Sequence, residues 1–317
     1  MPEQHELAIL LDGWRGWMPP EQLTPLLAGG WEPAPCKSTS GADPGYAVIA
    51  DFMELPDERA VAHHISGAYE ATPCHWMAGR DHVLLQASPQ PTHAEAVALA
   101  SAAADALDGT AIRVEPDGMW CVDTGFDLHA PGPLGALGRN VGSMLPMSGT
   151  PVAAKQFFNL LQMVWHEHPV NEARAKAGIA PINALWLSGR PHAAILDPIC
   201  TSTALMPSSG RRARRLAGAI QANSARATGR TVLWLESVRD ALLNGETEMG
   251  SAVRQDLAAL AQVLASPPRA AQISLIVTGP DGARRLRRLA EPSGLKRLAK
   301  LFGQRMDPDR LAAHLFE

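Results

Sequence analysis

Residues 162–190 read QMVWHEHPVNEARAKAGIAPINALWLSGR, and this stretch determines its local fold more sharply than any other part of the chain. It continues a helix with one apolar face, which begins near residue 157 and has apolar side chains at helical spacing. Pro169 disfavours helical backbone angles at His168, because the proline ring clashes with the residue before it. The chain is therefore predicted to turn at His168.

A short helix and then a strand are predicted after this turn. Residues 171–178, NEARAKAG, are rich in helix formers, with Asn171 suited to the N-cap and Gly178 suited to a left-handed C-terminal cap. Pro181 stops any continuation of the helix. The apolar run at 182–187 is short, and its length favours a buried strand. The sequence thus predicts helix, turn, short helix and strand in this order.

Several polar side chains lie near these element boundaries. We identify five as candidate ligand-binding residues: His168, Asn171, Arg174, Asn183 and Arg190. Side chains and free backbone groups at helix ends can converge on an anion, which favours this interpretation. The alternative is that the same side chains cap and brace the turn through hydrogen bonds to nearby backbone groups. Residue types alone do not separate the two interpretations.

The spacing of these residues resembles that of a known family. The pattern HEHPVN-x2-R-x3-G-x2-P-x-N-x2-W-L-x-G is similar to a segment of the archaeal-type cofactor-independent phosphoglycerate mutases, in the alkaline phosphatase superfamily. It resembles still more their short proteobacterial relatives, which include proteins described as regulator of pathogenicity factors, type E. Residues 80–82, RDH, precede an apolar run and resemble the same relatives. The resemblance implies a truncated alkaline phosphatase-like core.

Composition places the chain among globular proteins and excludes some partners. The chain has 317 residues, of which 46% are hydrophobic, so it can bury a sizeable core. A formal net charge of -4 gives no overall attraction to nucleic acid or to an anionic membrane, and we expect neither as a partner. The four cysteines show no C-x-x-C spacing and are interpreted as reduced thiols. No basic leader or membrane-length apolar run is evident, so we expect a cytoplasmic protein.

Short apolar runs that alternate with helical segments predict an α/β fold with a mixed or partly parallel sheet flanked by helices. The Gly- and Pro-rich residues 131–150 are the best internal boundary. We therefore predict an N-terminal part, 1–149, which contains a β-hairpin, and a C-terminal part, 150–317, which carries the HPVN-x2-R motif. Residues 46–52 are expected to form a strand. Two arginine clusters, at 211–215 and 284–288, are expected on solvated helix faces.

Asp12 is the candidate metal ligand. It follows a predicted strand at 6–11 and precedes Gly13, and members of the resembled superfamily commonly carry a metal-binding Asp-Gly at this place. The alternative is that Asp-Gly forms a turn, which is among the commonest uses of this dipeptide.

The resemblance leaves the metal centre of such an enzyme unmatched. Phosphoryl transfer in this superfamily needs a hydroxyl nucleophile and two metal ions held by Asp and His side chains. In the archaeal-type enzymes these ligands lie largely after the resembled segment, in Asp-x3-His and Asp-His contexts. Here only His192 and His314 follow it, and neither stands in such a context. The resemblance therefore indicates the family more strongly than the activity.

Three functions remain open, and we favour the first. The chain is a degenerate relative of the mutases, which keeps a pocket for a phosphorylated small metabolite and has a regulatory role. Alternatively, it is an active phosphotransferase or phosphatase with a rearranged site that uses Asp12 and Mn²⁺ or Mg²⁺; no cofactor is expected otherwise. In the third interpretation it is an interaction or scaffold protein with a protein partner.

Overall fold

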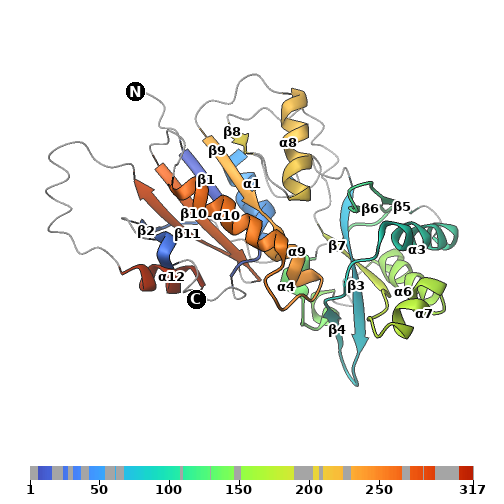
Figure 1. Cartoon of the computed structure of the whole chain (residues 1–317). Coiled ribbons are helices and arrows are strands. Elements are labelled where there is room, and N and C mark those ends of the chain that lie inside the picture. The colour runs from blue at the N-terminus through green and yellow to red at the C-terminus, as the bar shows by residue number, and fades with distance from the viewer. Residues whose placement is uncertain are drawn as a thin grey trace, which may run out of the picture.

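The structure is a computed structural model with an α/β fold, and two β-sheets organise it (Figure 1). It describes residues 6–15, 24–27, 31–36, 43–53, 61, 68–107, 110–128, 130–145, 151–188, 203–206, 210–223, 230–265, 272–280, 282–289 and 307–316. The predicted fold class is confirmed. None of the helices in these ranges is long and apolar enough to cross a membrane.

The larger sheet has six strands in the order β2-β11-β10-β1-β9-β8. Their bounds are β1 Glu6–Leu11, β2 Trp31–Ala34, β8 Thr203–Leu205, β9 Arg230–Leu235, β10 Gln272–Gly279 and β11 Gly282–Leu289. The four strands β10, β1, β9 and β8 are mutually parallel, whereas β11 runs antiparallel to both β10 and β2. The sheet is therefore mixed, as the sequence predicts, with β1 at its centre.

After Glu6, strand β1 is apolar, and its residues from Leu7 to Leu11 are buried on both faces of the sheet. Leu7, Ile9 and Leu11 pack into one core with helices α9 (Ser237–Leu243), α10 (Ser251–Ala265) and α12 (Pro308–Phe316). The alternate residues Ala8 and Leu10 pack into a second core on the other face. Helices α1 (Pro44–Met53) and α8 (Arg211–Asn223) cover that face. A short 3-10 helix, η2 (Thr24–Leu27), contacts α12.

Two expectations about secondary structure are wrong. Residues 46–52 belong to helix α1, and nearly all of their side chains are buried. A helix buried on most sides has no polar stripe, so its apolar run cannot be told from a strand by periodicity. The arginines at 284–288 lie on strand β11 and not on a helix. Arg285 and Arg287 form ion pairs with carboxylates at distances of 2.6 and 2.7 Å.

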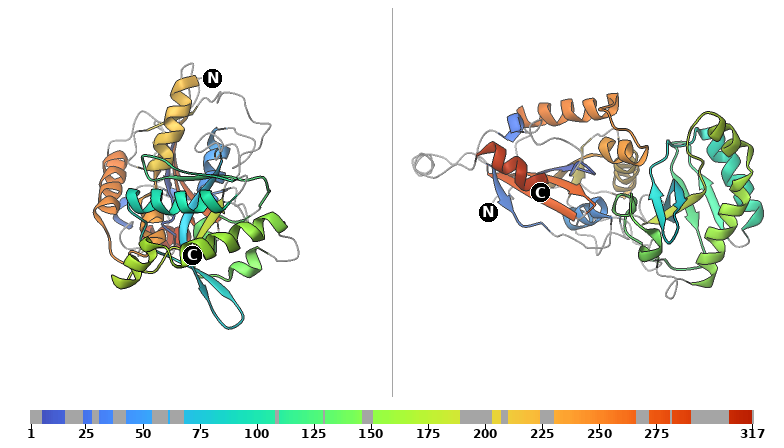
Figure 2. Two further views of the ribbon diagram at one scale, coloured as in Figure 1. Left: turned by 90° about the vertical axis from the view of Figure 1, so that its right-hand side faces the viewer. Right: turned by 90° about the horizontal axis from the view of Figure 1, so that it is seen from below.

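The smaller sheet is built around β3 (Tyr69–Ala78), which pairs antiparallel with three other strands. The remaining strands are β4 Val83–Gln86, β5 Ala111–Val114, β6 Trp120–Asp123 and β7 Ala184–Ser188. Strands β5 and β6 form the predicted hairpin. Helices α3 (His93–Ala106), α6 (Val152–His166) and α7 (Pro169–Lys176) lie on the side of this sheet away from the larger sheet (Figure 2). Their apolar side chains share one core with the sheet.

The two sheets divide the chain into three segments. Residues 6–53 and 203–316 build the larger sheet and its helices, and residues 69–188 build the smaller one. The boundary predicted between 149 and 150 lies inside this middle segment. It falls between α5 (Val141–Met144) and α6, after the short helix α4 (Pro133–Ala136). The first strand thus pairs with strands more than 200 residues later in the chain.

Gly13 makes the turn after β1 with a φ of +82°, and its backbone lies against helix α9. A Cβ at this position would lie 2.8 Å from the Cα of Arg239, whereas a Cβ at Gly138, with a φ of +71°, would meet nothing within 4 Å. Both glycines adopt a backbone conformation that costs an L-residue roughly 1–2 kcal/mol. Only Gly13 also has the close backbone contact.

We predict that Gly13→Ala lowers the free energy of unfolding by about 1–3 kcal/mol more than Gly138→Ala does, because α9 must shift. Urea denaturation of both variants beside the wild type measures the difference. Equal losses would show that α9 yields to the added methyl group at no cost.

Candidate functional site

The turn at His168 forms as predicted, but its cap is a different residue. Helix α6 ends at His166, and Pro169 is the first residue of α7. The N-cap is His168, whose Nδ1 accepts a hydrogen bond from the Val170 backbone N at 3.2 Å. Proline is favoured at the first helical position because its φ is already helical, so α7 begins before Asn171. Gly178 has a φ of +71°, as its predicted capping role requires.

The side chain of Asn171 bonds three backbone groups that α7 places around it. Its Nδ2 donates to the carbonyls of Trp165 and Ile182, both at 2.7 Å, and its Oδ1 accepts from the Ile182 N at 2.8 Å. Asn183 binds the backbone of Trp76 in the same way, through its Oδ1 at 2.7 Å and its Nδ2 at 3.0 Å. Asn171 and Asn183 thus join α6, α7, β7 and β3.

Arg174 is buried, and the contacts of its guanidinium are with neutral groups. Its Nε donates to the Ala180 carbonyl at 3.1 Å, and its Nη2 donates to Ser88 Oγ at 3.0 Å and to the Pro89 carbonyl at 2.6 Å. Burial lowers the pKa of Arg174 from its usual value. These bonds fasten the loop before α3 to the end of α7. Arg190 lies outside the described residues.

The four described candidates, His168, Asn171, Arg174 and Asn183, therefore all make hydrogen bonds within the chain. These bonds give each side chain a structural role without a ligand. Their predicted part in ligand binding stays a prediction.

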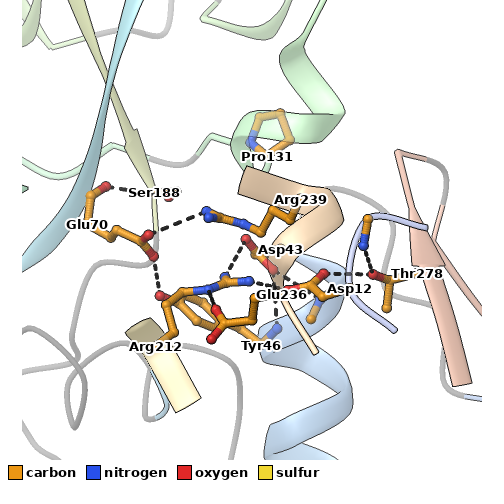
Figure 3. A network of polar contacts seen from close by, with 12 residues as sticks. Asp12, Asp43, Tyr46, Glu70, Pro131, Ser188, Arg212, Glu236, Arg239 and Thr278 are labelled. Atoms are coloured by element: carbon orange, nitrogen blue, oxygen red, sulfur yellow. Dashed lines mark hydrogen bonds and ion pairs between the residues drawn. The ribbon is translucent and has the colours of Figure 1, made fainter. Parts of the chain in front are cut away.

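A cluster of buried charges lies at the carboxyl ends of the parallel strands, where α/β sheets usually bind ligands (Figure 3). We call it the Arg212 cluster, and it consists of Arg212, Asp12, Asp43 and Glu236. Asp12 directly follows β1, and Glu236 directly follows β9. Arg212 is the second residue of α8, and Asp43 directly precedes α1. Four segments distant in the sequence thus meet at one point.

Each nitrogen of the Arg212 guanidinium contacts a different carboxylate. Nε donates to Glu236 at 2.7 Å, Nη1 pairs with Asp43 at 3.3 Å, and Nη2 donates to Asp12. The rings of Tyr46 and Trp234 lie 4.6 and 4.8 Å from its Cζ, which adds cation–π attraction. The Arg212 side chain is 1% exposed. The carboxylates and rings together compensate for the burial of its charge.

The carboxylates of the Arg212 cluster also hold helices in place. Asp43 accepts hydrogen bonds through its Oδ1 from the backbone N of Gly45 and Tyr46, in the first turn of α1. Glu236 accepts through its Oε2 from the Ala213 N at 3.0 Å, in the first turn of α8. A carboxylate at the start of a helix is stabilised by the helix dipole. Asp43 and Glu236 thus each bind Arg212 with one oxygen and the first turn of a helix with the other.

Asp12, the candidate metal ligand, has both oxygens in use. Its Oδ2 accepts from Arg212 and, at 3.2 Å, from Trp234 Nε1, and its Oδ1 accepts from Thr278 Oγ1 at 2.7 Å. Within the described ranges, no group of three or more His, Cys, Asp or Glu side chains could hold a metal ion. The described surroundings of Asp12 therefore fit a guanidinium better than Mn²⁺ or Mg²⁺. The described residues do not form a metal site around Asp12, and its role as a metal ligand stays a prediction.

Glu70, on β3, connects the Arg212 cluster to the smaller sheet. It accepts a hydrogen bond from the hydroxyl of Tyr46, and its Oε1 lies 3.4 Å from Arg239 Nη2. Arg239, on α9, is buried and also pairs through Nη1 with Asp240 at 3.3 Å. Burial raises the pKa of Glu70, but the guanidiniums of Arg239 and Arg212 outweigh it and hold this pKa at about 2. Glu70 is therefore a charged bridge between the sheets.

The pKa of Glu236 is raised, whereas that of Glu70 is lowered. Burial, together with the charge of Asp240, raises the pKa of Glu236 to about 7 against the opposing attraction of Arg212. Burial also raises the pKa of Asp43. The Arg212 cluster holds three carboxylates and one guanidinium, so a proton on one carboxylate relieves the excess of negative charge.

A cavity of about 160 Å³ opens beside this network, between the two sheets. Its polar lining includes Glu70, Thr72, Gln90, Arg211, Arg239, Asp240 and Asn244. Arg211 is the first residue of α8, and its Nε is buried without a hydrogen-bond partner. The Oδ1 of Asn244 is buried without a partner as well. Among the described residues, the cavity wall thus holds an arginine whose hydrogen-bonding capacity is not fully used.

Comparison with known proteins gives distant similarity only. No protein-family model matches the chain, and no curated protein matches it significantly. Among solved structures, it is similar to the PH0037 protein from Pyrococcus horikoshii, with a TM-score of 0.44 and 14% identity over 92% of this chain and 88% of that one. It is also similar to a cofactor-independent phosphoglycerate mutase from Thermoplasma acidophilum DSM 1728, with a TM-score of 0.35 and 14% identity over 99% and 93% of the two chains.

Sequence reasoning found Asp12 but missed its partners. The arginines at 211–215 were expected on a solvated helix face, and this is wrong for Arg212, which is almost fully buried. A local signal for Glu236 does exist, because it follows an apolar strand just as Asp12 does. Asp43, Tyr46 and Glu70 stand in no pattern that sequence spacing could have identified.

We predict that Asn171→Leu lowers the free energy of unfolding by about 3 kcal/mol or more. The change leaves three buried backbone groups without a partner, and each costs roughly 1–3 kcal/mol. Asn159→Leu, on the exposed side of α6, is the matched control and should change stability by less than about 0.5 kcal/mol. Guanidinium denaturation of both variants measures this difference. A small loss of unfolding free energy for Asn171→Leu would contradict the role of Asn171 in bracing the turn.

The raised pKa of Glu236 predicts a pH dependence of stability. Its folded pKa is about 7 and its reference value is 4.5, so its contribution is fully present below pH 4.5 and is lost as pH rises through 7. Glu236→Gln should therefore flatten the decline in unfolding free energy between pH 5 and 7.5 by about 1–3 kcal/mol. Glu172→Gln, at an exposed site, should leave the slope unchanged. An unaltered slope in Glu236→Gln would contradict the assigned pKa.

Proposed function

We propose that this protein binds a small anionic metabolite, phosphorylated or carboxylated, in the cavity between the two sheets, and that binding serves regulation. The observation that carries the proposal is the side chain of Arg211. It lines the cavity, and it forms no ion pair with a described residue. The charges of Glu70 and Asp117 act on Arg211 only from a distance, so an anion in direct contact would compensate its partly buried charge better. The fork of an arginine also matches the two oxygens of a carboxylate or phosphate.

The position and size of the cavity support the same proposal. Arg211 begins α8, so an anion beside it also meets the positive end of a helix dipole. A volume of about 160 Å³ is close to that of a protein cavity known to hold benzene, so a molecule of about six to ten non-hydrogen atoms fits. Larger ligands would extend out of it.

The link between the cavity and the Arg212 cluster supports a regulatory role. Glu70 and Arg239 line the cavity and also join the two sheets. The charge of Arg211 also stabilises the Glu70 carboxylate, so an anion bound to Arg211 competes with Glu70 for that charge and changes how the sheets are held. The guanidinium of Arg212 also binds Asp12, the residue that the resemblance would assign to a metal ion. We therefore favour a degenerate relative of those enzymes over an active one.

Ligand screening tests this function. Thermal shift assays with phosphoglycerates, hydroxy acids and amino acids should yield a ligand that, at 100 times its dissociation constant, stabilises the protein by about 2.7 kcal/mol. Arg211→Ala should weaken its binding at least tenfold, because the free guanidinium is lost. Arg214→Ala also removes one positive charge, but from the exposed side of α8, and this variant should bind the ligand as tightly as the wild type does.

Two outcomes would contradict the proposal. In the first, none of these compounds shifts the melting temperature of the wild type. In the second, Arg211→Ala and Arg214→Ala bind equally well. A separate assay of phosphate release from phosphoglycerates with Mn²⁺ or Mg²⁺ tests for catalysis, and turnover there would favour the phosphotransferase alternative.

A further inference from the structure

We infer that the ligand of this cavity is a zwitterion of the α-amino acid type, with its carboxylate on Arg211 and its ammonium group on Asp240. The inference rests on the proposed function and narrows it, because it selects one class among small carboxylates and phosphates. The choice of ligand class depends on which charged groups of the cavity wall can still form an ion pair.

The charged side chains of the cavity wall differ in how many hydrogen bonds and ion pairs they already form. Glu70 has both oxygens engaged, one by Tyr46 and one by Arg239. Arg239 is shared between Glu70 and Asp240. Arg211 has no ion pair and Asp240 has one, through Oδ1 alone, among the contacts of the described residues. The groups left to meet a ligand are therefore one cation and one anion.

Asp240 is accessible enough to take a ligand group. Its side chain is 43% exposed, and it lies on α9 one turn before Asn244, which also lines the cavity. Residues four apart lie on the same face of a helix, so Asp240 and Asn244 line the cavity from the same side, and the oxygens of the partly exposed Asp240 carboxylate are the acceptors there. An ammonium group offers three donors for such acceptors. A hydroxyl offers one donor and carries no charge for Asp240 to attract.

The charge behind the wall opposes a dianion. The two buried arginines Arg212 and Arg239 are outnumbered by the four buried carboxylates Asp12, Asp43, Glu70 and Glu236. Burial and the nearby charge of Asp240 raise the pKa of Glu236, so further negative charge here is opposed. A phosphate dianion would add two negative charges beside these groups, in surroundings where charges are screened weakly. A zwitterion adds no net charge, and its ammonium end offsets part of the excess.

A pair of isosteric compounds tests the inference. Serine and glycerate differ at one position, where serine has an ammonium group and glycerate a hydroxyl. Isothermal titration at pH 7 should show serine binding at least tenfold more tightly than glycerate to the wild-type protein. Asp240→Asn keeps the oxygen that pairs with Arg239 and removes the charge, so it should abolish the preference while glycerate binding changes less than threefold. Arg211→Ala should weaken the binding of both compounds at least tenfold.

The outcomes separate this inference from the proposed function. If glycerate or 3-phosphoglycerate binds as tightly as serine or more so, the zwitterion assignment is wrong and the anion-binding function stands. If serine is preferred equally in wild type and Asp240→Asn, Asp240 does not hold the ammonium group, and the assignment is wrong as stated. If serine, glycerate and 3-phosphoglycerate all fail to bind the wild type, both proposals are overturned for this cavity. Circular dichroism melts of Asp240→Asn confirm that it is folded.

Discussion

The buried guanidinium of Arg212 is the constraint on which the larger part of the fold depends. A charge that is 1% exposed must be compensated, because an unpaired buried ion costs several kcal/mol. Compensation requires Asp12, Asp43 and Glu236 to converge from three separate segments. Asp43 also holds the first turn of α1, and Glu236 that of α8. The position of the ion therefore sets where two helices begin relative to the ends of β1 and β9.

This constraint extends to the smaller sheet through a short chain of contacts. Tyr46 stacks on Arg212 and donates to Glu70, and Glu70 pairs with Arg239 on α9. The cavity lies beside that chain and shares two of its members, Glu70 and Arg239. A ligand there would act on the groups that connect the sheets. The proposed binding would thus be coupled through charge to the contacts that join the sheets.

The most distinctive sequence pattern and the candidate site lie in different places. His168, Asn171, Arg174 and Asn183 follow one another in a recognisable motif, and each bonds groups within the lobe of the smaller sheet. The residues of the Arg212 cluster and of the cavity wall are scattered from Asp12 to Asn244. A motif is visible because its members interact locally. Dispersed sites lack that local signal.

Features that depend only on neighbouring residues can be predicted from the order of the amino acids. These are the α/β class, the turn at Pro169, the left-handed Gly178 and the hairpin at Pro116-Asp117-Gly118, since backbone angles and turn chemistry are local properties. Other features follow from packing between distant segments: Arg212 is buried, residues 46–52 form a helix, and Asp12 binds an arginine. Asp12 and Arg212 are 200 positions apart. Their pairing depends on long-range strand order and desolvation, which no local pattern records.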